Sequence, residues 1–310
     1  MNILYKDDVL KEVNKTILTG VTLIKNYTEQ PTKTGSTYFG GNLEAKGELG
    51  FKVWRGSCFD KMNSEDYSGK ICLVQAEINE YNGTKSLILK DISVVPNDIL
   101  EKEDIRKGDF LQSKYDAEAY YATLYQTLQS HVTSEALQVF DLVMSDIKDK
   151  FIEEYAAVNY HDNCRNGLLA HTTKVVKMST LIKMYPALLK RVSVDALYVG
   201  SALHDIGKVI EYDTGVISKL GKSLSHLTIG CIMISKYKDE IVALKGEDFY
   251  NTLLSIISQH HGEFGDQPRT IAAYVVHQLD MMDATFTLLN QKLEEGEDNT
   301  QISYNNMKLV

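Results

Sequence analysis

The sequence is poor in cysteine, in long apolar runs and in positive charge. Its four cysteines are scattered and form no paired spacing of the kind that binds a metal, so we expect free thiols in a reducing compartment. No apolar run approaches the length that spans a bilayer, and the early acidic residues at positions 7 and 8 argue against a signal peptide. We therefore expect a cytoplasmic protein that does not act at a membrane.

The acidic charge balance excludes another class of protein. The formal net charge of −9 argues against a protein that coats duplex DNA through its phosphates. This balance still allows a local basic groove, or a site in which bound metal supplies the positive charge. The chain has no internal repeat or low-complexity tract, and its 310 residues are enough for two domains.

The first third of the chain, from about residue 16 to residue 97, is typical of a small β-barrel. Short β-prone runs alternate here with turn-rich segments, and Asn82-Gly83 is a strong hairpin signal because both positions accept positive φ. The five runs are residues 21–24, 36–39, 51–54, 71–78 and 85–90. Five strands of this size favour an OB-fold.

Such a barrel has candidate side chains for binding single-stranded nucleic acid. Phe39 and Trp54 are candidate stacking platforms for bases, and Lys52 and Arg55 are candidate phosphate contacts. The alternative is that both aromatic residues fill the barrel core, because aromatic residues on period-two strands often do so. The sequence leaves both interpretations open.

The rest of the chain is predicted to be helical, from about residue 114 to residue 293, with Ser134 as a plausible N-cap of the second helix. Histidines and aspartates recur in its apolar segments. Burying an adjacent His-Asp pair is unfavourable unless hydrogen bonds or a cation satisfy both. Side chains from several helices can converge on one centre, as in bundle cores. The candidate metal ligands are His171, His204, Asp205, His226, His260, His261 and Asp280.

The order H…HD…H…HH…D resembles the HD-domain superfamily of metal-dependent phosphohydrolases. Segments 166–172, 204–208 and 258–262 resemble one branch in particular, the YhaM-type 3′-to-5′ exoribonucleases, which join an N-terminal OB-fold to a C-terminal HD domain. Asn166 and Ala170 depart from the Gly and Glu that this branch commonly has there.

The resemblance implies a multidomain fold, in which an all-β OB-like barrel precedes an all-α HD bundle. We expect residues 1–97 to bind nucleic acid and residues 98–150 to form a linker with helices leading into the HD domain. Residues 151–293 would form that domain, and residues 294–310 a polar tail. The branch also implies a homo-oligomer.

By analogy with the family, one ion would be held by His171, His204, Asp205 and Asp280. A second would be held by His226, His260 and His261, with Asp205 bridging. Ligands without thiolate suit two divalent ions, Mn²⁺ first, with Fe²⁺, Co²⁺ or Mg²⁺ as alternatives. Asp205 and Lys208 are the expected catalytic residues, with Lys208 and, as a weaker candidate, Arg269 contacting substrate phosphate.

Three functions are weighed. The first is a metal-dependent 3′-to-5′ exonuclease acting on single-stranded RNA, with single-stranded DNA as a second candidate substrate. The alternative is an HD phosphohydrolase acting on small nucleotides, either nucleoside triphosphates or cyclic dinucleotides. A non-catalytic adaptor is the third, and the complete ligand set counts against it. The barrel favours a polymer, whereas the acidic charge mildly favours a small substrate.

Overall fold

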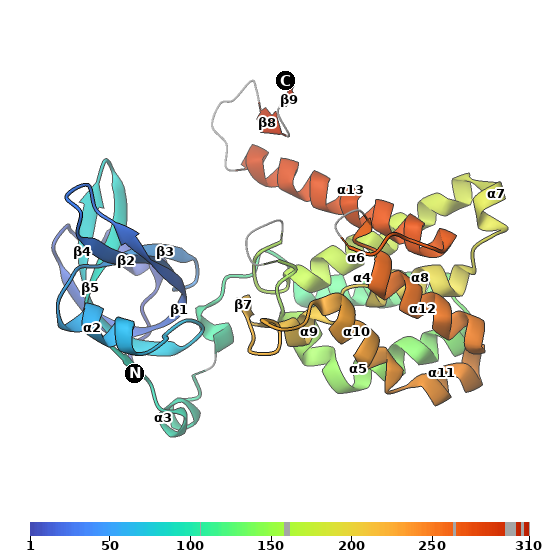
Figure 1. Ribbon diagram of the computed structural model, residues 1–310, viewed down its shortest axis with the longest axis horizontal. Helices are drawn as coiled ribbons and strands as arrows, with labels where there is room; N and C mark the ends of the chain where they lie inside the picture. Colours follow the sequence, from blue (N-terminus) through green and yellow to red (C-terminus); the bar gives the residue numbers. More distant parts are fainter. Residues whose placement is uncertain (106, 158–161, 263–264, 295–301, 305–306, 310) are drawn as a thin grey trace. The chain divides into compact units, whose positions relative to one another are not determined.

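The computed structural model describes the chain except for residues 106, 158–161, 263–264, 295–301, 305–306 and 310. It divides into two compact units, Met1–Gln112 and Ser113–Val310, each of which is described by itself (Figure 1). The first is a barrel and the second is helical.

The barrel unit is a closed sheet of five strands in the order β1-β2-β3-β5-β4. All neighbouring strands are antiparallel except β3 and β5, which are parallel. The strands are β1 (Ile17–Pro31), β2 (Thr37–Glu44), β3 (Glu48–Val53), β4 (Ile71–Tyr81) and β5 (Thr84–Val94). The helices are α1 (Lys6–Lys11), α2 (Ser57–Ser64), α3 (Asn97–Lys102) and the 3₁₀ helix η1 (Lys107–Phe110). The predicted OB-like barrel is confirmed.

The barrel core follows from the two-residue period of the strands. Along β4, Val74, Ala76 and Ile78 point inward and are buried, because successive side chains of a strand face opposite sides. The hairpin between β4 and β5 turns at Asn82 and Gly83, whose φ angles are 49° and 75°. The predicted turn is therefore present, with both residues in the left-handed region.

The helical unit packs most of its helices around one apolar core. Its helices are α4 (Ala117–His131), α5 (Ser134–Glu153), α6 (Gly167–Met178), η2 (Ser179–Met184), α7 (Pro186–Leu189), α8 (Val194–Leu203), α9 (Lys208–Glu211), α10 (His226–Ser235), α11 (Lys238–Lys245), α12 (Glu247–Gln259) and α13 (Ile271–Glu294). Leu124, Phe140, Leu168, Tyr198 and Leu253 belong to one buried cluster, although they come from five different helices. Helices α4 and α5 are therefore part of this core.

Short two-stranded sheets complete the helical unit. They pair β6 (Tyr212–Asp213) with β7 (Val216–Ile217), and β8 (Ile302–Tyr304) with β9 (Met307–Leu309). The second pair lies in the segment predicted as a polar tail, much of which falls outside the described residues.

Thr133, not the predicted Ser134, is the N-cap residue of α5. The Thr133 hydroxyl donates to Asp195 Oδ2 at 2.6 Å and its backbone N–H donates to Oδ1 at 2.9 Å. Lys245 Nζ lies 2.6 Å from the same Oδ2 atom. This network joins the starts of α5 and α8 to the end of α11.

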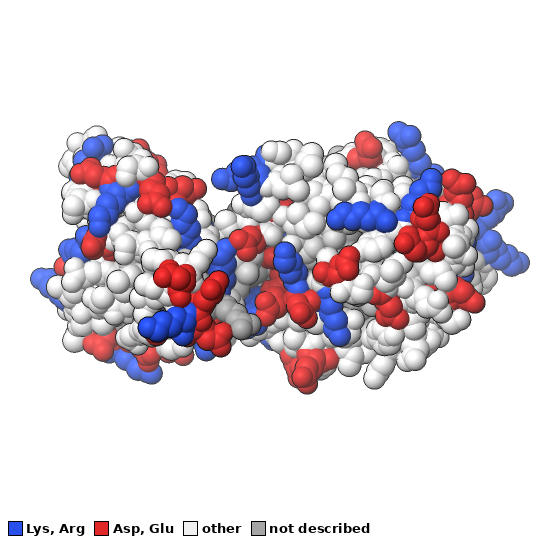
Figure 2. All heavy atoms as spheres, turned by 90° about the horizontal axis from the view of Figure 1, so that it is seen from below, with Lys and Arg blue, Asp and Glu red and all other residues white. Residues whose placement is uncertain are grey.

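Among the described residues, every helix is too short or too polar to cross a bilayer. Figure 2 shows acidic and basic side chains interspersed over one face of the molecule.

Candidate metal centre

The seven predicted ligands lie together at one place in the helical unit. They come from five parts of its fold: α6, the end of α8, the start of α10, the end of α12 and the middle of α13. Three of these parts are helix termini, since α8 ends at Leu203, α10 begins at His226 and α12 ends at Gln259. Two clusters of possible ligand atoms result, which are His171, His204 and Asp280, and Asp205, His226, His260 and His261.

The first cluster brings three side chains to one point. His171 Nε2 lies 3.2 Å from His204 Nε2 and 3.1 Å from Asp280 Oδ1. Ligand atoms bonded to one ion at about 2.1 Å lie about 3.0 to 3.4 Å from one another in octahedral or tetrahedral geometry. The observed spacings fit this range. Both histidines are fully buried.

The second cluster has the same spacing. His226 Nε2 lies 3.1 Å from His261 Nε2, and Asp205 Oδ1 lies 3.5 Å from His226 Nε2 and 3.4 Å from His260 Nε2. Asp205 Oδ1 and His260 Nε2 are buried and make no hydrogen bond within the described part of the chain. Buried polar atoms normally have a partner, so two such atoms facing each other fit a cation between them.

Asp205 stands between the two clusters. Its Oδ2 atom lies 3.5 Å from His171 Nε2 and 3.4 Å from His204 Nε2, while Oδ1 faces the second cluster. One carboxylate therefore offers one oxygen to each side. The donor set of imidazole and carboxylate, without thiolate, suits divalent metal ions.

Close backbone packing brings the two clusters together. Gly207 follows the His-Asp pair, and a Cβ atom added to it would lie 2.0 Å from the carbonyl oxygen of His226 and 2.8 Å from the backbone nitrogen of Gly230. Only glycine permits this approach. The start of α10 therefore packs directly on the turn that carries Asp205.

Lys208 lies at the centre as predicted, in contact with a ligand. Its Nζ atom lies 2.6 Å from Asp205 Oδ2, and the residue is 8% exposed. Although burial opposes ionisation, the Lys208 ammonium and the ring of His204 hold the pKa of Asp205 well below its usual range. Asp205 is therefore an ionised carboxylate at neutral pH.

The histidines differ in protonation. Burial lowers the pKa of His204 to about 3, and burial together with His260 and His226 lowers the pKa of His261 to about 4. At His171 burial is outweighed by Asp280 and Asp283, which raise its pKa to about 10. His204 and His261 are therefore neutral at pH 7, the form that binds a metal.

Two carboxylates at the centre were not predicted from the sequence. Asp283 Oδ2 lies 2.7 Å from His171 Nδ1, and Glu211 Oε2 lies 2.7 Å from His226 Nδ1. The sequence had one signal for Asp283, which follows Asp280 by three residues on an otherwise apolar helix and so shares its face. Glu211 had no comparable signal.

A third cluster of possible ligands is already neutralised. Asp162, His171 and Asp283 lie close enough to hold an ion. Lys174 Nζ, however, lies 2.8 Å from Asp162 Oδ2 and 3.2 Å from Asp283 Oδ2. The ammonium therefore takes the place of a cation there.

None of the other predicted contact residues belongs to the described clusters of possible ligand atoms. Arg269 is exposed, and its backbone N–H donates to Gln259 Oε1 at 3.0 Å. In the barrel unit, Phe39 is 7% exposed and stacks on Phe59 with ring centroids 4.5 Å apart. The prediction that Phe39 is a stacking platform is therefore wrong, because the ring fills the barrel core.

Trp54, Lys52 and Arg55 are accessible in the barrel unit. Trp54 is 45% exposed and lies 5.0 Å from the ring of Tyr38, over which Lys52 Nζ also lies at 5.6 Å. Arg55 donates to Thr37 Oγ1 at 2.6 Å. Lys52 borders two cavities of about 370 and 410 Å³, and Trp54 and Tyr81 line the second.

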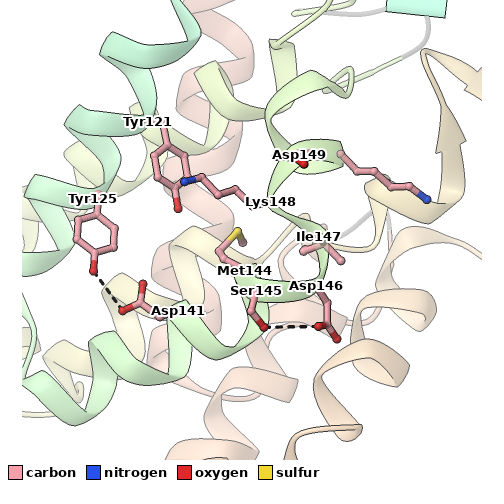
Figure 3. Close-up of a pocket in the computed structure, with 10 residues that line it drawn as sticks. Tyr121, Tyr125, Asp141, Met144, Ser145, Asp146, Ile147, Lys148 and Asp149 are labelled. Atoms are coloured by element: carbon pink, nitrogen blue, oxygen red, sulfur yellow. Dashed lines mark hydrogen bonds between the residues drawn. The ribbon is translucent and has the colours of Figure 1, made fainter. Parts of the chain in front are cut away.

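A larger cavity than these two lies in the helical unit, on α4 and α5. It has a volume of about 840 Å³ and is lined by Tyr121, Tyr125, Asp141 and Lys148 among others (Figure 3). Tyr125 donates to Asp141, and Lys148 Nζ lies 4.4 Å from the ring centre of Tyr121. None of the candidate ligands lines this cavity, so its size does not mark the chemical site.

Comparison with known proteins agrees with this geometry. Residues 168–285 match the family model of the HD domain. The helical unit therefore contains a domain of the HD family, and the protein is a hydrolase. The chain is 28% identical to the 3′-5′ exoribonuclease YhaM of Listeria monocytogenes, over 88% of this chain and 86% of the relative. It is 26% identical to YhaM of Geobacillus sp. (strain WCH70), over 88% of this chain and 84% of that protein.

Two solved structures are similar to smaller parts of the chain. The mitochondrial single-stranded DNA binding protein Rim1 of S. cerevisiae is 18% identical with a TM-score of 0.25, covering 27% of this chain and 96% of that one. A chain of a replication protein A heterotrimer bound to ssDNA is 12% identical, also with a TM-score of 0.25, covering 34% of this chain and 89% of that one.

Proposed function

We propose that the protein is a metal-dependent 3′-to-5′ exonuclease that acts on single-stranded RNA, and also on single-stranded DNA. The observation that carries the proposal is the Asp205 carboxylate, which directs one oxygen to each of two clusters of imidazole and carboxylate groups. The similarity to YhaM over most of the chain supports the direction of degradation and the choice of RNA.

The candidate ligands form two sets, each of which would bind one divalent cation. Among divalent metals, Mn²⁺ suits this donor set best. One set would be His171, His204, Asp205 and Asp280, and the other His226, His260, His261 and the same Asp205. Bound divalent cations in such a site lower the pKa of a water and offset charge on the attacked phosphate.

Lys208 supplies the charge that the protein itself brings to the reaction. Its ammonium contacts Asp205 and is largely shielded from water, so a phosphate oxygen arriving beside Asp205 would meet it without rearrangement of the backbone. The Lys208 side chain would orient the phosphate and balance its developing negative charge. Arg269, which is exposed, is a weaker candidate for the same role.

The barrel unit would bind the strand through its exposed residues. Trp54 offers a ring face for stacking, and Lys52 and Arg55 offer charge to phosphates. The two cavities that share Lys52 would hold neighbouring nucleotides. This arrangement favours a polymer over the small nucleotides of the alternative function.

The test is the fate of a 5′-labelled single-stranded RNA incubated with Mn²⁺, with either a free or a blocked 3′ hydroxyl. The proposal expects a ladder that shortens from the free 3′ end, little cleavage of the blocked strand, and no activity with chelator. Asp205→Ala should remove all turnover, whereas Asp248→Ala, which changes an exposed carboxylate on α12, should leave it unchanged.

Three results would contradict the proposal. Equal cleavage of both RNAs would indicate an endonuclease. Hydrolysis of nucleoside triphosphates or cyclic dinucleotides, with the RNA left intact, would favour the small-nucleotide alternative. Activity retained in Asp205→Ala would remove this centre from the mechanism.

A further inference from the structure

Asp283 lies on the far side of the His171 ring from the candidate cation. Asp280 Oδ1 approaches Nε2 of this ring at 3.1 Å, whereas Asp283 Oδ2 approaches Nδ1 at 2.7 Å. The two ring nitrogens point in different directions, so a carboxylate on Nδ1 does not share an ion bound at Nε2. When a cation displaces the proton from Nε2, the hydrogen bond from Nδ1–H to Asp283 keeps the remaining proton on Nδ1 and directs the Nε2 lone pair toward the centre.

Asp283 is itself held in place by two further contacts. Lys174 Nζ lies 3.2 Å from its Oδ2 atom, and the Thr287 hydroxyl donates to Oδ1 at 3.3 Å. Asp283 is only 4% exposed. Because both of its oxygens have partners, the carboxylate has one orientation, and so does the imidazole bonded to it.

Glu211 makes the corresponding contact in the other half of the centre. Its Oε2 atom lies 2.7 Å from His226 Nδ1, and its Oε1 atom accepts the backbone N–H of the same residue at 3.0 Å. The carboxylate thus holds both the ring and the backbone of His226 at the start of α10. The Nε2 atom of His226 is left facing Asp205 and His261.

Two other candidate ligands, His204 and His260, have backbone carbonyls instead of carboxylates at Nδ1. His204 Nδ1 lies 2.8 Å from the carbonyl oxygen of Ser201, and His260 Nδ1 lies 3.1 Å from that of Ile257. Each candidate ion position therefore has one histidine held by a local backbone carbonyl and one held by a carboxylate from elsewhere in the fold.

We propose that Asp283 and Glu211 are positioning residues, one for each ion. Each keeps the proton on Nδ1 of its histidine, so that Nε2 is directed at a bound divalent cation. Neither is placed to touch substrate. The inference rests on the proposed function only in requiring that the centre binds divalent cations. Such outer contacts typically change metal affinity by about 10- to 100-fold.

The test measures Mn²⁺ binding to the full-length protein by calorimetry and by metal content after equilibrium dialysis. We expect two bound ions in the wild type. Asp283→Ala should lower the affinity for the ion beside His171 by about 10- to 100-fold and leave the affinity for the second ion unchanged. Glu211→Ala should lower the affinity for the ion beside His226 by a similar factor and leave the first unchanged. Asp283→Asn should lie between Asp283→Ala and the wild type, because asparagine keeps a hydrogen-bond acceptor. Asp248→Asn is the matched control.

Wild-type affinity for both ions in Asp283→Ala and Glu211→Ala would overturn the inference. An equal loss of affinity for both ions, in a variant with the melting temperature of the wild type, would overturn the assignment of one residue to each ion. If an alanine variant does not fold, Mn²⁺ affinity is measured in Asp283→Asn and Lys174→Met instead. Wild-type affinity in both of these variants would overturn the role of Asp283. A wild-type protein that binds no Mn²⁺ would instead contradict the proposed function as well.

Discussion

The barrel unit and the helical unit bury charge in different ways. In the barrel, Lys25 and Glu44 are both 6% exposed, and they pair with each other at 3.4 Å while Lys25 also meets Glu48 at 2.7 Å. In the helical unit, Asp205 and His260 bury atoms that have no hydrogen-bond partner in the described chain. In the described residues, these buried charges of the barrel neutralise one another, whereas the helical core buries atoms whose geometry fits a cation.

Candidate functional residues are exposed in the barrel unit, whereas the candidate metal ligands are buried or half-buried in the helical unit. The barrel keeps its candidate binding residues outside, as Trp54 does, and fills its interior with residues such as Phe39. The helical unit keeps its candidate reactive groups inside, where low dielectric strengthens electrostatic interactions. Changes in the barrel should therefore separate stability from binding, while changes at the metal centre should affect both.

The largest expected effect separates the two aromatic residues of the barrel. Phe39→Ala should lower the free energy of unfolding by about 3–5 kcal/mol, because it empties space in the core. Trp54→Ala should change stability by about 0.5 kcal/mol or less but weaken binding of single-stranded RNA by about 1–3 kcal/mol. Urea unfolding and RNA titration measure these quantities. Similar losses of stability in both variants would contradict the inside–outside distinction.

A smaller effect distinguishes the two units by their response to cations. Mn²⁺ at about 100 times its dissociation constant should stabilise the helical unit by about 2.7 kcal/mol and leave the barrel unchanged. The chain has a single tryptophan, Trp54, which lies in the barrel, so its fluorescence reports barrel unfolding while far-UV circular dichroism reports the helices. Asp205→Ala should abolish the shift, and an equal shift of both signals would contradict the comparison.

The smallest effect concerns an ion pair outside the metal centre. Burial opposes ionisation of Asp195, but hydrogen bonds from Lys245 and Thr133 lower its pKa below the usual 3.8. A carboxyl with a lowered folded-state pKa stabilises the protein above its unfolded-state pKa, and the effect disappears as pH falls through the folded-state value. Asp195→Asn should therefore cost about 1 kcal/mol at neutral pH.

The pH dependence of that variant is its own control. The difference in stability from the wild type should decline below about pH 4, in urea unfolding measured at a series of pH values. Asp248→Asn should show no such dependence. A difference for Asp195→Asn that stays constant from neutral to acidic pH would assign the effect to packing instead of charge.

Much of the fold could be predicted because the signals are local. The hairpin at Asn82-Gly83 and the strands beside it follow from turn chemistry and period-two alternation. The order of histidines and aspartates identified seven residues that the structure gathers into two adjoining clusters of possible ligand atoms. Asp280 was recognisable because a lone carboxylate in an apolar helix needs a partner.

The predictions for Phe39 and for the N-cap of α5 were wrong because contacts between residues distant in sequence decide both. The sequence could not distinguish Phe39 in the core from Trp54 on the surface, because both are aromatic residues of neighbouring strand segments. Ser134 and Thr133 are both good N-caps, and Thr133 occupies that position where its hydroxyl reaches Asp195 from another helix.

By itself, the sequence determined the order of the two units, the type of each element and the kinds of side chain available to bind a cation. These depend on residue spacing and on chemistry within a few positions along the chain. Only the tertiary structure decided which nitrogen of each imidazole faces the centre, and that Asp283 and Glu211 hold the opposite nitrogens. Those contacts depend on how helices distant in sequence pack together, as where the close approach at Gly207 brings α10 against Asp205.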